Sequence, residues 1–147
     1  MPTAAEIKKA LKEAGLEVYR TRGDAVYLAD RVRENLLMDA GTFVRGGVGV
    51  SAHTGFIVRA QRNDFPNDGE EHLFERARHA AASAIARGYR ETAAEVRKVL
   101  DPGDGERTLD TWCEITFEKE LSALDAAVVE ARFALGLEKA ATPTRQP

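Results

Sequence analysis

Three residues of one predicted helix could bind a divalent metal ion: His72, Glu75 and His79. They stand at positions i, i+3 and i+7, so they share one helix face. Arg76 and Arg78 lie on the same arc, whereas alanines fill the opposite arc. This distribution indicates a solvated face, and no second helix offers matching ligands. We therefore predict no metal site and no cofactor.

His53 and Cys113 are the other residues with catalytic potential. A general base needs a nucleophile or an orienting carboxylate beside it. Ser51 and Thr54 are close to His53 in sequence, but Ser51 and His53 side by side on a strand face form a commonplace arrangement. Cys113 alternates with apolar residues, and a thiol among apolar neighbours has a raised pKa and little reactivity. The sequence therefore predicts no catalytic residue.

Trp112 is the most informative single residue. Strand alternation places it opposite the apolar face, beside Glu114 and Thr116. Two interpretations stand equally: another part of the chain covers the indole, or the indole anchors an interface, where Trp is enriched.

Composition limits the class of protein. The chain has 147 residues, 44% of them hydrophobic and 31% charged, a length that fits one domain. Its net charge of −3 and its pI near 5.7 are untypical of polyanion binders. A single cysteine excludes an internal disulfide. We expect no membrane span and no export signal, and hence a cytoplasmic protein.

An arginine-rich region runs from residue 20 to residue 62. Its seven arginines against four acidic residues give a local charge of +3. Such a region could serve an acidic partner or RNA, but no exposed aromatic residues interleave with the arginines. We therefore expect no nucleic-acid partner, and weak RNA binding is kept only as a third hypothesis.

The first half of the chain predicts one helix followed by strands. Thr3 and Glu6 form a capping box for a helix that ends at Gly15. Gly23 and the residue after it predict a hairpin. Residues 29–39 fit either a helix or a long second strand carrying Val32 and Leu36 inward, and we choose the strand. A period-two pattern then predicts another strand, with apolar residues at even positions: Val48, Val50, Ala52, Phe56, Val58 and Ala60.

The second half predicts two helices around a second hairpin. Asp68 caps a helix that runs to about residue 87, with a buried face of Leu73, Ala77, Ala80, Ala81, Ala84 and Ile85. Two paired strands are predicted over residues 89–100 and 111–118, with a turn between them. A last helix covers about 119–138, and its two apolar stripes are wider than one sheet contact requires. Residues 140–147 predict a disordered tail behind a single domain of residues 1–139.

These elements predict an α+β fold: one antiparallel sheet with helices packed on it, in the order α-β-β-β-α-β-β-α. In order, size and acidity, residues 3–138 resemble the class I type III secretion chaperones and the related YbjN-like proteins. The resemblance implies a non-enzymatic homodimer that holds an extended segment of a partner protein against apolar surface and sheet edge.

The leading hypothesis is thus a chaperone- or adaptor-like protein-binding module that uses a sheet face or edge, by strand addition and side-chain pockets. Its candidate contact residues are Trp112, Glu114, Thr116, Val129 and Phe133. The alternative is a small α+β enzyme or ligand-binding domain that recognises an acidic small molecule. Arginine forks suit carboxylate or phosphate, and the candidate residues of this site are His53, Arg59 and Gln61.

Overall fold

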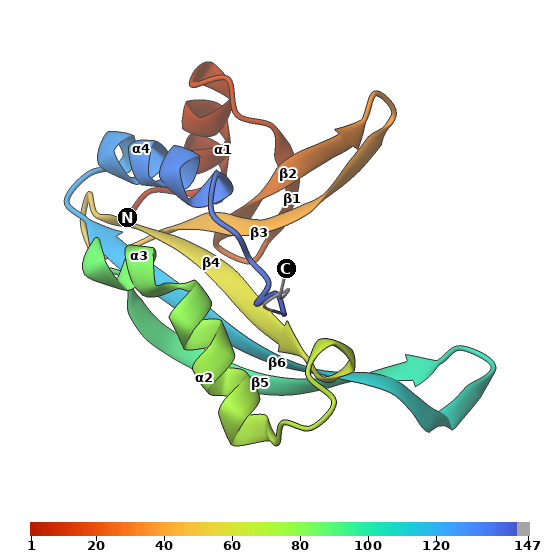
Figure 1. The fold of residues 1–147 in the computed structure, drawn as a ribbon. Coiled ribbons are helices and arrows are strands. Elements are labelled where there is room, and N and C mark those ends of the chain that lie inside the picture. Colours follow the sequence, from red (N-terminus) through yellow and green to blue (C-terminus); the bar gives the residue numbers. More distant parts are fainter. Residues whose placement is uncertain (144–147) are drawn as a thin grey trace. The chain divides into compact units, whose positions relative to one another are not determined.

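The computed structural model describes residues 1–143 (Figure 1). The predicted α+β class and antiparallel sheet are confirmed, and so is the predicted order of helix and strand blocks. Six strands lie in the order β1-β2-β3-β4-β6-β5. The strands are β1 (Val18–Arg22), β2 (Ala25–Arg33), β3 (Leu36–Gly46), β4 (Ala52–Gln61), β5 (Arg90–Asp101) and β6 (Asp104–Leu121). The helices are α1 (Ala4–Glu13), α2 (Glu70–Ala80), α3 (Ala82–Ala86), α4 (Leu124–Leu135) and the short 3-10 helix η1 (Arg62–Asp64).

The chain divides into two compact units. Unit 1 contains Met1–Phe56 and Glu118–Leu137, and unit 2 contains Ile57–Phe117 together with the residues from Glu138 onward. Strands β4 and β6 each contribute residues to both units. The expectation of one domain over residues 1–139 therefore stays a prediction. None of the helices in the described part of the chain has both the length and the apolar character needed to cross a membrane.

Unit 1 has a core built from α1, α4 and the inner sides of three strands, β2, β3 and β4. Thr3 and Glu6 form the predicted capping box at the start of α1. The Arg132 guanidinium donates a 2.6 Å hydrogen bond to the Ala14 carbonyl just past the end of α1, which ties α1 to α4. Burying this apolar cluster stabilises unit 1. Its buried members are Ile7, Leu11, Val26, Leu28, Val44, Ala52, Ala127, Val128 and Ala131.

Residues 29–39 are extended and not helical, so the strand predicted for this stretch is confirmed. A turn at Glu34 and Asn35 divides them between β2 and β3, so the first block contains four strands. Val32 and Leu36 are 52% and 43% exposed, so the expectation that they point inward is wrong. The pairing partners of β1 end at Leu28, and β4 pairs with β3 only from Thr42 onward. From Asp30 to Asp39, β2 and β3 continue as a two-stranded ribbon in which every residue is exposed.

The period-two pattern correctly predicts β4 but begins too early. Val48 and Val50 are 91% and 76% exposed, in the loop before the strand. Gly49 in that loop has φ +64°, a left-handed conformation that favours glycine over other residues. From Ala52 onward, buried and partly buried residues alternate along β4, and His53 lies within the strand.

In unit 2, α2 and α3 pack on strands, and the sequence predicts which residues of these strands face inward. The predicted helix over residues 68–87 is interrupted at Ala81, and Gly69 occupies the N-cap position in place of Asp68. Asp68 instead pairs with Arg76. On the helix face expected to be buried, Ile85 is 45% exposed because α3 is a separate short helix. The predicted inward-facing residues of β6 are confirmed as buried: Cys113, Ile115 and Phe117.

The C-terminal end differs from the prediction in two ways. Strand β6 continues to Leu121, so the last helix begins at Leu124 and not near residue 119. The predicted tail begins with Ala140, which forms a parallel bridge with Arg59 of β4. Residues 144–147 of the predicted tail lie outside the described residues.

Candidate binding surfaces

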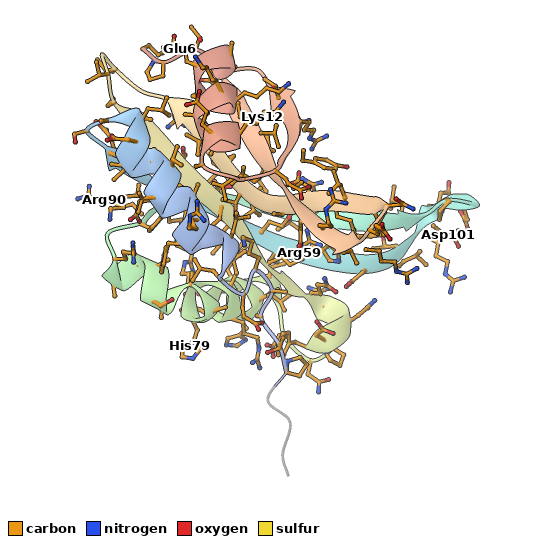
Figure 2. The ribbon with its side chains drawn as sticks, turned by 90° about the horizontal axis from the view of Figure 1, so that it is seen from above. Glu6, Lys12, Arg59, His79, Arg90 and Asp101 are labelled. Atoms are coloured by element: carbon orange, nitrogen blue, oxygen red, sulfur yellow. The ribbon has the colours of Figure 1, made fainter. Side chains whose placement is uncertain are left out.

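Trp112 lies on β6, and both its indole N–H and the face of its ring contact residues of unit 2. Its indole N–H donates a 2.9 Å hydrogen bond to the Asp110 carboxylate. The guanidinium of Arg59, a residue labelled in Figure 2, lies 4.0 Å from the centre of the indole ring, within the range of a cation–π contact. The ring is partly buried. These contacts support the interpretation in which the chain itself covers the indole, and the role of Trp112 as an interface anchor stays a prediction.

Glu114 lies beside Trp112 and is buried, although alternation places it on the polar face. Its side chain is 9% exposed and lies within 3.7 Å of Arg59 and 2.9 Å of Arg97. A buried carboxylate is costly unless it is paired, so the two arginines compensate its desolvation. The arginine side chains remain 35% and 62% exposed. Unit 2 thus presents two cations to solvent over one buried acid.

The sequence predicts different sites for Arg59 and Trp112. Alternation puts each of them on the non-apolar face of its strand, which the burial patterns of β4 and β6 confirm. The missing information was that β4 and β6 are neighbours in the sheet. Two strands that are more than 40 residues apart in sequence carry no local signal of that pairing.

The remaining predicted site residues divide between the two units. His53 belongs to unit 1, where its Nε2 lies 3.8 Å from the Glu120 carboxylate. Arg59 and Gln61 belong to unit 2, so the alternative ligand-binding set is not assembled within either unit. Val129 and Phe133 lie one turn apart on α4 in unit 1, with Val129 62% exposed.

A long ribbon is formed by β5 and the first part of β6, residues 90–110. All residues from Arg90 to Lys98 are exposed, and so are those from Pro102 to Leu109. Strand β5 is the last in the sheet order, so its outer edge has no neighbouring strand among the described residues. Val96, Leu100 and Leu109 are 40–47% exposed on this ribbon. In Figure 1 it extends beyond the end of α2.

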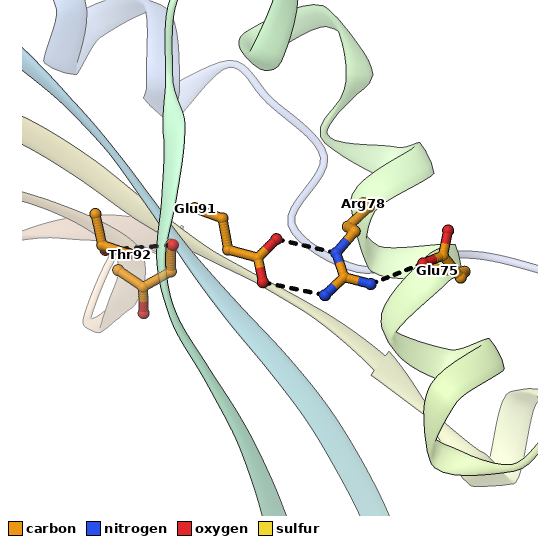
Figure 3. A network of polar contacts seen from close by, with 5 residues as sticks. Glu75, Arg78, Glu91 and Thr92 are labelled. Atoms are coloured by element: carbon orange, nitrogen blue, oxygen red, sulfur yellow. Dashed lines mark hydrogen bonds and ion pairs between the residues drawn. The ribbon is translucent and has the colours of Figure 1, made fainter.

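An ion-pair network fastens the start of the ribbon to α2 (Figure 3). Arg78 donates two hydrogen bonds to the Glu91 carboxylate, at 2.9 and 3.1 Å, and one of 2.8 Å to Glu75. The hydrogen bonds from Arg78 lower the pKa of Glu91, and those carboxylates raise the pKa of Arg78. The network holds the start of β5 against α2 at Glu91 and does not include residues 93–98.

A groove of about 680 Å³ lies between α2 and the segment 138–142, and we call it the α2 groove. The helix face that carries His72, Glu75 and His79 lines it, with the side chain of His79 projecting from α2 (Figure 2). In residues 1–143, no group of three or more His, Cys, Asp or Glu side chains could hold a metal ion. The groove is lined by Phe65, Asp68, His72, Glu75, Arg76, His79, Ala80, Glu138, Ala140, Ala141 and Thr142.

Sequence reasoning found one wall of the α2 groove and missed the other. The spacing of His72, Glu75 and His79 correctly places them on one exposed helix face. The second wall comes from a segment with neither helix nor strand periodicity. Only its pairing with Arg59 reveals that it lies against the fold.

Comparison with known proteins gives no independent assignment of this fold or of these surfaces. The resemblance to secretion chaperones therefore stays a prediction. The chain matches no family model, no curated protein sequence and no solved structure.

Proposed function

We propose that this protein is a non-enzymatic protein-binding module, chaperone- or adaptor-like, that associates through the outer edge of β5 and forms a homodimer there. The observation that carries the proposal is the run of nine consecutive exposed residues, Arg90–Lys98, on a strand at the end of the sheet. An edge strand offers unpaired N–H and C=O groups, which a second strand can complete.

The length of the ribbon supports a role in association. Isolated two-stranded ribbons are at best marginally stable in water, and natural proteins shorten or protect strand edges. Strand β5 has twelve residues and leaves Val96 and Leu100 exposed. A partner strand would pair the free backbone groups and cover these side chains.

The charge pattern of β5 favours a second copy of the same chain as the partner. A twofold axis at Val96 places Glu95 of one copy opposite Arg97 of the other, and the reverse. Opposite charges directly across antiparallel strands are stabilising. Three flanking pairs in this register place no like charges together: Ala94 with Lys98, Ala93 with Val99, and Thr92 with Leu100. The next pair places Glu91 opposite Asp101, and each of these carboxylates is already paired with an arginine of its own chain.

Trp112, Glu114 and Thr116 lie on β6, the strand beside β5. In the proposed dimer they form the second row of side chains behind the interface. Glu114 is joined to β5 through Arg97, so these residues stay candidate contact residues of the partner-binding surface.

Light scattering on the full chain tests the proposal. We expect a mass of twice the 16.1 kDa of one chain for the wild type. Val96→Lys places two like charges together at the twofold axis and should return the mass to one chain, with an unchanged circular dichroism spectrum. Val48→Lys in the loop before β4 is the matched control because Val48 is also exposed, and its mass should stay that of the dimer. A monomeric wild type, or a dimeric Val96→Lys variant, would overturn the proposal.

A further inference from the structure

The α2 groove has a wall made of extended backbone. The Arg59 N–H donates to the Lys139 carbonyl at 3.0 Å, and the Ala141 N–H donates to the Arg59 carbonyl at 2.8 Å. These two bonds form a parallel bridge in which Ala140 is the residue opposite Arg59. Segment 139–141 is therefore attached to β4 as a short strand.

Ala140 leaves its own backbone groups free for a ligand. In a parallel bridge, residues 139 and 141 direct their bonding groups toward β4, so the N–H and C=O of Ala140 point to the opposite side. Neither group has a hydrogen-bond partner within residues 1–143. Because Ala140 also lines the α2 groove, the groove contains an open strand edge.

The charged side chains around the groove are mainly acidic. Asp68, Glu75 and Glu138 line it against a single cation, Arg76. Arg76 is already engaged, because it pairs with Asp68 and lies 4.0 Å from the ring centre of Phe65. With neutral histidines the lining carries a formal charge of −2.

Glu138 is the acidic side chain best placed to meet a ligand. Glu75 already forms an ion pair with Arg78 at 2.8 Å, whereas Glu138 takes part in no ion pair in the described part of the chain. Glu138 is exposed and lies two residues before the open edge at Ala140. An extended chain that pairs with Ala140 can therefore bring a cationic side chain to Glu138.

We propose that the α2 groove binds an extended peptide bearing lysine or arginine. The peptide backbone adds as a strand to the N–H and C=O of Ala140, and its cationic side chain pairs with Glu138 and Glu75. The groove volume falls within the range of about 300–1,000 Å³ that is usual for ligand sites. A nucleic acid is disfavoured by the negative lining. This inference deepens the proposed protein-binding function by naming a peptide class, but it uses a surface other than β5.

Fluorescence anisotropy with labelled synthetic peptides tests the site on the full chain. The first probe alternates valine and lysine, the second alternates valine and glutamate, and the third is the lysine peptide with N-methylated backbone amides. We expect the lysine peptide to bind at least tenfold more tightly than either of the others, because only it has both the cation and the donors. Equal affinities for the three peptides would overturn the proposal.

Two charge-reversal variants localise the binding. Glu138→Lys should weaken binding of the lysine peptide at least tenfold, whereas Glu106→Lys, an exposed position on the ribbon, makes the same charge change away from the groove. An equal loss with both variants would mean that net charge and not the groove binds the peptide. In heteronuclear NMR spectra, the Ala140 amide should shift on peptide addition, and an unchanged Ala140 signal would exclude strand addition.

The Val96→Lys variant separates this inference from the proposed dimer. It should lose self-association and still bind the lysine peptide with unchanged affinity. Loss of the dimer with peptide binding retained leaves the α2 groove proposal intact, whereas a wild-type dimer without peptide binding overturns the groove proposal alone.

Discussion

The ring of Phe43 in β3 lies across Gly55, its cross-strand partner in β4. A Cβ atom on Gly55 would stand 2.3 Å from Cζ of that ring and 2.9 Å from Cγ of Glu118. On the neighbouring strand, the ring of Tyr27 lies 5.3 Å from the ring of Phe43. Phe43 is therefore held between an aromatic ring and a position where only glycine fits.

Gly55→Ala should destabilise unit 1 because the added methyl group must displace the Phe43 ring. Overpacking of this kind costs about 1–3 kcal/mol in the free energy of unfolding. Chemical denaturation measures it, with Gly105→Ala as control because nothing lies within 4 Å of a Cβ there. In a Phe43→Ala background the penalty should shrink, and an equal penalty in both backgrounds would show that the ring is not the obstacle.

Arg59→Ala should shift the fluorescence emission of the chain to longer wavelength. Trp112 is the single tryptophan in the sequence, so the signal reports one ring. Removal of Arg59 uncovers the ring face that the guanidinium now covers. Arg97→Ala is the matched control, since Arg97 pairs with the same Glu114 carboxylate. Identical emission from Arg59→Ala and wild type would contradict the stacked arrangement.

The Arg78–Glu91 pair predicts a loss of stability in acid. Since Arg78 lowers the pKa of Glu91 in the folded state, the pair contributes stability that is present above the ordinary glutamate pKa of about 4.3. That contribution disappears as the pH falls through the lowered folded-state pKa of Glu91. Both side chains are 34–36% exposed, so we expect no more than about 1 kcal/mol.

Denaturation midpoints of wild type and Glu91→Gln, measured between neutral and acid pH, check this expectation. The two proteins should differ at neutral pH and converge in acid. Glu106→Gln is the control, because Glu106 is exposed on the same ribbon without an ion pair in residues 1–143. A difference between wild type and Glu91→Gln that stayed constant with pH would rule out the pair as its cause.

Cys113 should resist alkylation in the native protein. Its side chain is fully buried, and burial, with a further contribution from Glu70, raises the pKa of the thiol. The thiolate is the reactive form, so labelling should proceed only when unit 2 opens. Iodoacetamide labelling followed by mass spectrometry should track unfolding by denaturant. Rapid labelling under native conditions would contradict the packing of β6 against the core.

Local sequence signals predict the elements well and their mutual positions poorly. Alternation along β6 correctly identifies Cys113 as buried, and the capping box at Thr3 correctly starts α1. Alternation also predicts Val32 as buried, which is wrong, because burial depends on whether a third strand or a helix covers that stretch of ribbon. Periodicity shows which residues share a face of a helix or strand. It does not show how much of that face a neighbouring strand or helix covers.

Both candidate surfaces illustrate the same limit. Arg59 meets Trp112 through the adjacency of β4 and β6, and the α2 groove exists because Ala140 returns to β4. These contacts join residues separated by about 50 and 80 positions. No helix or strand propensity, cap or turn near either residue indicates which distant residue it contacts. The charge pattern of β5 is local, so it can be read from the sequence.

The hydrogen bond from Arg132 to Ala14 joins residues 118 positions apart in sequence. Unit 1 consists of two stretches of chain, with residues 57–117 inserted between them. During synthesis on the ribosome, α1 and the first four strands must therefore wait for α4 before their shared core can close. Contacts of such long sequence separation slow folding, so nascent chains should remain sensitive to proteases until α4 has emerged from the ribosome.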